Sequence, residues 1–164
     1  MRGLEGFEEI WAADFEYSAP AGHRPAPICL VATELRTGRH LRFWEDQLAR
    51  MAAPPFRTDH RSLFVAYAAA AEFGCFHVLG WKAPARVLDL FFEFRALANG
   101  LQTPSGSGLL GAMVYHGLPV MEAAEKESMM AESRSGAGAG IVAESSRRSC
   151  SGMAGGVAPG CRRP

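Results

Sequence analysis

Two carboxylates at the end of an apolar stretch constrain the fold of this chain more than any other feature. Residues 10–17 read Ile-Trp-Ala-Ala-Asp-Phe-Glu-Tyr, a run of strand-forming residues that contains Asp14 and Glu16. Alternate side chains of a strand share a face, so these two acids are expected to project together. Like charges held that close need neutralisation, and Mg²⁺ binds both carboxylate and phosphate oxygens. The pattern predicts a metal site suited to phosphodiester cleavage at the end of a first strand.

A change in composition near residue 128 divides the chain. Residues 1–127 hold all 16 aromatic side chains, together with 15 acidic and 12 basic residues. Residues 128–164 hold no aromatic residue and no Leu, and 25 of these 37 positions are Gly, Ala, Ser or Arg. Such a segment buries too little apolar surface to offset its ordering entropy. We therefore expect a foldable domain over residues 1–130 and a disordered low-complexity tail over 131–164.

The cysteines and the apolar runs favour a cytoplasmic protein. Cys29, Cys75, Cys150 and Cys161 form no C-x-x-C pair, so they predict neither a zinc site nor a disulfide framework. The N-terminus lacks the pattern of a signal peptide, and no apolar run is long enough to span a bilayer. We expect a cytoplasmic location and no membrane partner.

The order of the apolar segments predicts an α/β fold. Strands are expected over residues 10–17, 28–35, 40–44, 62–67 and 86–90, and helices over 46–51, 68–79, 91–98, 109–116 and 121–129. A turn at Thr37-Gly38 makes the first three strands an antiparallel meander. Helices alternate with the later strands, which favours a mixed sheet that combines the meander with parallel strands, flanked by helices.

Other candidate residues follow the later strands. Glu72 lies one turn into the helix after strand 62–67, where a third carboxylate on the same face of the sheet would reach Asp14 and Glu16 within metal-bridging range. The alternative for Glu72 is a solvated face of an Ala-rich helix. Asp89 also ends a strand, and we favour a helix N-cap for it over direct metal ligation.

Three further residues are interpreted as structural. His77 is favoured as a core or groove histidine, and His116 as an ordinary residue of a C-terminal helical turn. Cys75 is favoured as a small buried hydrophobic residue over a nucleophile.

A series of short blocks in a fixed order carries a resemblance to a known family. The blocks are residues 10–17, 64–68, 71–75, 87–90, 93–95, 99–101, 108–112 and 124–128. In this order they resemble the 3′–5′ exonuclease domains of the DEDD superfamily, over about residues 8–130. More narrowly, they resemble the exonuclease half of phage-type DNA polymerase I proteins found in bacteria. The resemblance implies a ribonuclease-H-like fold and hydrolysis of single-stranded DNA from its 3′ end.

The resemblance also implies roles for individual residues. Two Mg²⁺ or Mn²⁺ ions perform the hydrolysis in this family. Asp14 and Glu16 match the catalytic and metal-binding acids of the first motif, and Glu72 occupies the acid position of the second, where many relatives use Asp. Tyr17, just beyond the first motif, would contact the terminal nucleotide.

The third motif of the family has no counterpart in this chain. That motif is a helix with a Tyr or His and a later metal-binding Asp, whereas this chain contains no Asp after Asp89. We expect a domain that is incomplete at its C-terminus, through a shifted reading frame near residue 130 or an error in the gene sequence. The polymerase domain is then missing, and little or no exonuclease activity is expected. The alternatives are a non-catalytic nucleic-acid-binding or interaction fragment, and an RNA-directed exonuclease on the same fold.

Overall fold

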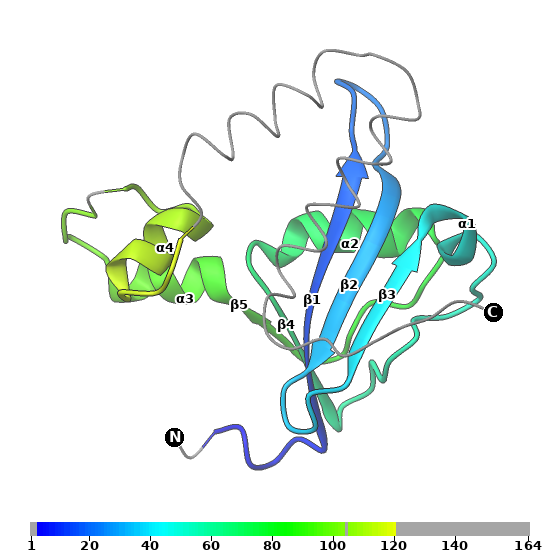
Figure 1. The fold of residues 1–164 in the computed structure, drawn as a ribbon, viewed down its shortest axis with the longest axis horizontal. Helices are drawn as coiled ribbons and strands as arrows, with labels where there is room; N and C mark the ends of the chain where they lie inside the picture. The colour runs from blue at the N-terminus through cyan, green and yellow to red at the C-terminus, as the bar shows by residue number, and fades with distance from the viewer. Residues whose placement is uncertain (1–2, 104, 121–164) are drawn as a thin grey trace. The chain divides into compact units, whose positions relative to one another are not determined.

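A five-stranded mixed sheet forms the centre of the computed structural model, which describes residues 3–103 and 105–120 (Figure 1). These residues belong to one unit of the chain, Met1–Val120. The helix expected over 121–129, the tail over 131–164 and the last block of the resemblance lie outside the described residues. Among the residues that the structure describes, no helix is long and apolar enough to cross a membrane.

The sheet has β1 at its centre. Its strands are β1 (Glu9–Ser18), β2 (Ala26–Glu34), β3 (His40–Trp44), β4 (Ser62–Ala66) and β5 (Val87–Asp89), in the spatial order β3-β2-β1-β4-β5. β2 pairs antiparallel with both β1 and β3, which confirms the expected meander. β4 pairs parallel with both β1 and β5, which confirms the expected parallel strands.

Within the described part of the chain, four helices flank the sheet, and each lies where the sequence predicts one. They are α1 (Glu45–Leu48), α2 (Ala69–Val78), α3 (Leu90–Leu97) and α4 (Leu109–Tyr115). α1 ends three residues earlier than the expected Met51. The amides of Arg50 and Met51 bond to the carbonyl oxygens three residues before them, so the last turn tightens as helix ends commonly do.

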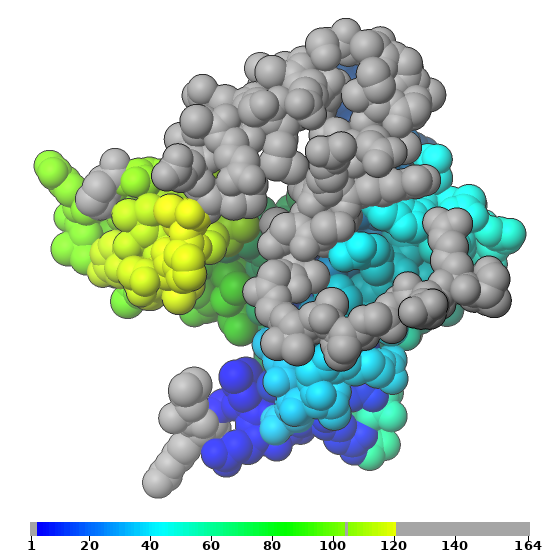
Figure 2. Space-filling model, in the orientation of Figure 1, coloured from blue at the N-terminus to red at the C-terminus, as the bar shows by residue number. Residues whose placement is uncertain are grey.

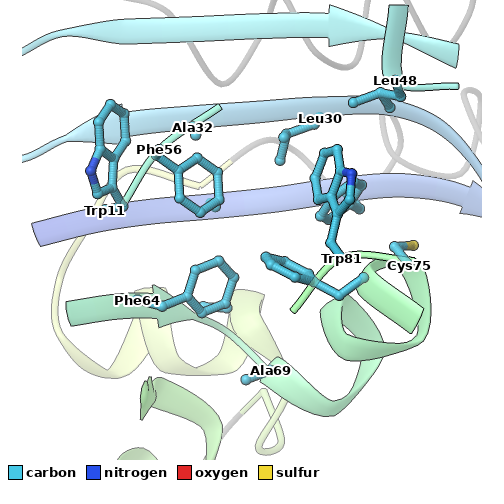
Figure 3. Close-up of a cluster of buried hydrophobic side chains, with 13 residues drawn as sticks. Trp11, Leu30, Ala32, Leu48, Phe56, Phe64, Ala69, Cys75 and Trp81 are labelled. Carbon is cyan, nitrogen blue, oxygen red and sulfur yellow. The ribbon is translucent and has the colours of Figure 1, made fainter. Parts of the chain in front are cut away.

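α2 packs on the sheet face that carries Trp11, Ala13 and Phe15 (Figure 3). The ring of Phe76 on α2 lies 5.9 Å from the ring of Phe15 and 5.6 Å from that of Trp81, measured between centroids. Edge-to-face aromatic contacts of this kind add to the area buried. This aromatic core holds α2 firmly against β1.

The opposite face of the sheet has a smaller apolar cluster. Ile10, Leu63 and Val65 are buried there, and Phe7 and Leu88 pack against them. Side chains along a strand alternate between the two faces, so the even-numbered residues of β1 belong to this side.

α3 and α4 lie beyond the β5 edge of the sheet (Figure 1). The hydroxyl of Tyr67, just after β4, donates to the carbonyl oxygen of Ser107 at 2.6 Å. The rings of Phe94 on α3 and Tyr115 on α4 lie 5.4 Å apart. At Gly111 an added β-carbon would lie 2.1 Å from the Gly106 carbonyl oxygen, so the α4 backbone and the preceding loop approach too closely for any side chain.

Candidate functional site

β1 extends well beyond its parallel neighbour β4. β1 has ten residues, but only residues 9–12 pair with β4, which ends at Ala66. The second half of β1 therefore has an open edge on the β4 side. The backbone groups along this edge need other hydrogen-bond partners if they are buried.

The amide of Phe15 faces this open edge. On the β2 side, the carbonyl oxygen of Ile10 accepts from Leu35 N–H at 2.8 Å. Successive residues of a strand direct their backbone groups to alternate edges, so odd-numbered residues of β1 face β4. Phe15 lies past the last paired residue, Ala12, where β4 offers no carbonyl oxygen to it.

Glu72 supplies the hydrogen-bond acceptor that β4 does not provide at the open edge of β1. It belongs to the first turn of α2 and is only 3 % exposed. Its Oε2 atom accepts from Phe15 N–H at 2.8 Å, a contact between residues 57 positions apart. The alternative interpretation, a solvated helix face, is wrong for Glu72.

Asp14 and Glu16 are half-buried and project from the face opposite α2. This corrects the expectation that Glu72 and Asp14 share one face of the sheet. α2 packs over Phe15 because its own apolar residues match that face. The Glu72 carboxylate reaches the plane of the sheet through the open edge of β1, so the three acids approach one another around that edge.

Two of the three carboxylates, those of Asp14 and Glu72, have a raised proton affinity. Burial, and then the charge of Glu16, raise the pKa of Asp14 to about 6. Burial, and then the charge of Asp14, raise the pKa of Glu72 to about 8, although the Phe15 N–H bond lowers it and Glu16 adds a smaller increase. Carboxylates that repel in a desolvated place have a high affinity for protons or for cations.

Tyr17 borders the same carboxylates. The pairing of β1 with β2 is irregular between Glu16 and Tyr17, and the Tyr17 side chain is 36 % exposed. Burial raises its pKa, followed by the nearby Cys75 and by the charges of Glu72, Asp14 and Glu16. The residue predicted to contact a substrate therefore lies beside the acids, with part of its surface accessible.

Cys75 is fully buried one turn after Glu72. Burial, and then the charges of Glu72 and Asp14, raise the pKa of its thiol to about 12. The reactive thiolate is therefore suppressed, which agrees with the interpretation of Cys75 as a small hydrophobic residue.

The structure corrects one of the histidine interpretations. His77 is exposed and therefore not in the core, because the buried side of α2 runs through Ala69, Cys75 and Phe76. His116 is the C-cap of α4, as expected, and its amide donates to the Ala112 carbonyl oxygen at 3.0 Å.

Asp89 is the N-cap of α3, as predicted, with Phe91 N–H donating to Oδ1 at 2.9 Å. It also accepts from the amides of Ala68 and Ala69 at 3.1 and 2.8 Å. Sequence reasoning missed these two bonds, because no local pattern links residue 89 to the start of a helix some 20 residues earlier.

Glu34 is a second buried acid that sequence reasoning missed. One carboxylate oxygen accepts from Ile10 N–H at 2.9 Å, and the other accepts from the Thr37 N–H and hydroxyl, each at 2.7 Å. Burial raises the pKa of Glu34, but these bonds and a longer one from Arg36 N–H outweigh it and lower the pKa to about 2. The sequence pattern that could have predicted these bonds is an acid three residues before Thr37, where its side chain can accept from the amides of the Thr37-Gly38 turn.

The acids of the open edge are not arranged as a finished metal centre. Among residues 3–103 and 105–120, no three His, Cys, Asp or Glu side chains are placed so that they could hold a metal ion. The expected convergence within metal-bridging range is therefore not met. The donors do suit Mg²⁺ or Mn²⁺ in kind, since all three are carboxylates, and only one oxygen of Glu72 bonds to Phe15.

Comparisons with known proteins leave the family open. A scan of protein-family models, a search of curated proteins and a search of solved structures each found no match to this chain. The function must therefore be argued from the carboxylates at the open edge of β1.

Proposed function

We propose that this chain carries a ribonuclease-H-like 3′–5′ exonuclease site of the DEDD type, built on Asp14, Glu16 and Glu72. One observation carries the proposal: the buried Glu72 reaches the open edge of β1 beside the two acids of that strand. The strand order β3-β2-β1-β4-β5, with β1 central, is compatible with such a fold.

The proposed roles follow from the chemistry of the residues. Asp14, Glu16 and Glu72 would hold divalent cations, Mg²⁺ or Mn²⁺, and such cations would supply charge that stabilises the attacking and leaving oxygens at a scissile phosphate. Tyr17, beside these acids and partly exposed, contacts the terminal nucleotide at the 3′ end of single-stranded DNA. Cation binding releases protons near neutral pH, because the pKa of Asp14 is about 6 and that of Glu72 about 8.

We propose cation binding with little or no turnover for this chain. Residues 90–164 contain no Asp, so the fourth acid that the resemblance implies has no counterpart. Removing one member of a preorganised electrostatic site commonly costs about 10²–10³ in rate.

The first test measures Mn²⁺ binding to the whole chain by calorimetry near pH 8. Asp14→Asn and Glu72→Gln each remove one negative charge and keep the side-chain shape, so each is expected to weaken binding at least about tenfold. Asp46→Asn is the matched control, because Asp46 lies on the surface in an exposed ion pair with Arg50. Unchanged Mn²⁺ affinity in both site variants would reject the proposal.

The second test is nucleotide release from a 3′-labelled single-stranded DNA, with an RNA of the same sequence in parallel. Release close to background is expected with either metal. Robust release that disappears in Asp14→Ala would instead show that another acid, such as Glu132 or Glu144, replaces the missing one. Preference for the RNA strand would favour the RNA-directed alternative.

A non-catalytic interaction or nucleic-acid-binding fragment is the second candidate, and the surface of α3 and α4 favours it. Phe92 is 65 % exposed, and Leu97 and Leu118 are also largely exposed. The surface of α4, yellow in Figure 2, is open to view on one side of the molecule. Large exposed apolar side chains are common at contact sites. Binding of the labelled DNA without any Mn²⁺ affinity would select this candidate.

A further inference from the structure

Asp89 joins the starts of two helices with one carboxylate. It ends β5 directly beside Ala66, the last residue of β4. Its Oδ1 accepts from Phe91 N–H at the start of α3 and from Ala68 N–H before α2. Its Oδ2 accepts from Ala69 N–H, the first residue of α2, at 2.8 Å.

The start of α2 depends on this carboxylate. Ala68 has φ 66° and ψ 59°, and it is the one non-glycine residue with positive φ among residues 3–103 and 105–120. A β-carbon makes this left-handed conformation strained. Ala68 is also the N-cap of α2, and no side chain of its own caps the helix. Asp89 therefore supplies, from a distant position in the sequence, a negatively charged acceptor for the amides of the N-cap residue and of the first residue of α2.

The position of this helix start determines where Glu72 lies. Glu72 follows Ala68 by about one helical turn, and its carboxylate must reach the Phe15 amide at the open edge of β1. We infer that Asp89 is a positioning residue of the proposed cation site. Asp89 fixes the junction between β4 and α2, and this junction places the Glu72 carboxylate at the Phe15 amide. This inference rests on the proposed function for its consequence, but its geometry is testable without any cation.

Two substitutions separate the bonds to α2 from the cap of α3. Asp89→Asn can keep its remaining oxygen on Phe91 and Ala68, but its NH₂ group then faces the Ala69 donor. Asp89→Ser caps Phe91 through its short hydroxyl and cannot reach Ala68 or Ala69. Both residue types are good N-caps, so α3 keeps its cap in each variant.

The readout is amide hydrogen exchange of Phe15, measured by NMR relative to residues 9–12 in the paired part of β1. Protection of Phe15 is expected to fall about tenfold or more in Asp89→Ser, and less in Asp89→Asn, while Phe91 stays protected. Glu72→Ala gives the reference for complete loss of the bond. Asp59→Asn is the control, because Asp59 accepts from an amide in an exposed turn far from α2.

Unchanged Phe15 protection in both variants would overturn the inference. If Asp89→Ser unfolds, Asp89→Asn decides alone. Mn²⁺ affinity is measured on the same samples, and it should fall together with Phe15 protection. A wild-type chain that binds no Mn²⁺ would reject the proposed function, whereas the exchange data would still decide the role of Asp89.

Discussion

Two buried glutamates on either side of β1 have opposite acidities. Glu34 and Glu72 are both 3 % exposed, and each accepts a backbone N–H of β1, from Ile10 and Phe15 respectively. Yet the pKa of Glu34 is lowered to about 2, and the pKa of Glu72 is raised to about 8. Burial and a bond to β1 are common to both, so neither explains the difference.

The surroundings of the two carboxylates explain it. Burial raises the pKa of each, but Glu34 also accepts from Thr37 and Arg36, whose donors stabilise its negative charge. Glu72 lies near the negative charges of Asp14 and Glu16, which disfavour a further one. Donors around a buried acid stabilise its charged form, whereas other acids around it raise its affinity for protons, as they do for Glu72.

The largest expected effect is that of Glu34→Ala. It leaves the amides of Ile10 and Thr37 without their acceptor in a buried place, so we expect a loss of about 3–5 kcal/mol in the free energy of unfolding. Urea denaturation near pH 7 measures this. A loss below about 1 kcal/mol would mean that the bonds to Glu34 are replaced by water, and the contrast between the two glutamates would disappear.

The pH dependence of stability should show both glutamates at once. Glu34 has a lowered pKa, so its contribution is complete above about pH 4.5 and is lost as the pH falls toward 2, by about 2–3 kcal/mol. Asp14 and Glu72 have raised pKa values, so their cost is small near pH 4, grows as the pH rises, and is complete above about pH 6 for Asp14 and about pH 8 for Glu72. Thermal melts without metal should therefore show the highest midpoint near pH 4–5. A maximum at pH 8 would contradict the raised pKa values.

Glu72→Gln should stabilise the metal-free protein at alkaline pH. The amide oxygen can still accept from Phe15 N–H, and the repulsion with Asp14 is removed, so we expect a gain of about 1–3 kcal/mol at pH 9. At pH 4, where Glu72 is protonated in the folded protein and largely protonated in the unfolded chain, the change should be close to zero. Urea denaturation at the two pH values measures this, with Asp46→Asn as the control. Equal effects at both pH values would show that packing, not charge, distinguishes Glu72.

The smallest expected effect concerns two residues with positive φ, one near each of the two buried glutamates. Ala68 lies four residues before Glu72, and Gly38 lies four residues after Glu34; both have positive φ. Ala68→Gly removes left-handed strain of about 1–2 kcal/mol but adds chain entropy, so we expect a net gain of about 0.5 kcal/mol. Gly38→Ala is the reciprocal control and should cost about 1 kcal/mol. A destabilised Ala68→Gly protein would show that the Ala68 methyl group contributes packing.

Local patterns in the sequence predicted the elements and part of the site. The alternation in residues 10–17 predicts β1, and an Asp before an apolar helix predicts the Asp89 cap of α3. For Glu72, the sequence left a solvated helix face as the alternative to a position beside Asp14 and Glu16, since an Ala-rich helix has little hydrophobic contrast between its faces. The bonds from Asp89 to α2 and the choice of the Phe15 face by α2 depend on residues distant in sequence, and no spacing rule contains them.

The early end of β4 makes the proposed cation site separable from the scaffold that carries it. If β4 continued for two more residues in regular geometry, a backbone carbonyl would take the Phe15 amide, and Glu72 would be displaced toward solvent. The aromatic core on α2 would need little change, and every acid would remain in the sequence. A short insertion at residues 66–68 could thus silence such a site without altering any of its carboxylates. Inactive relatives would then be recognised by the length of one strand and not by a missing acid.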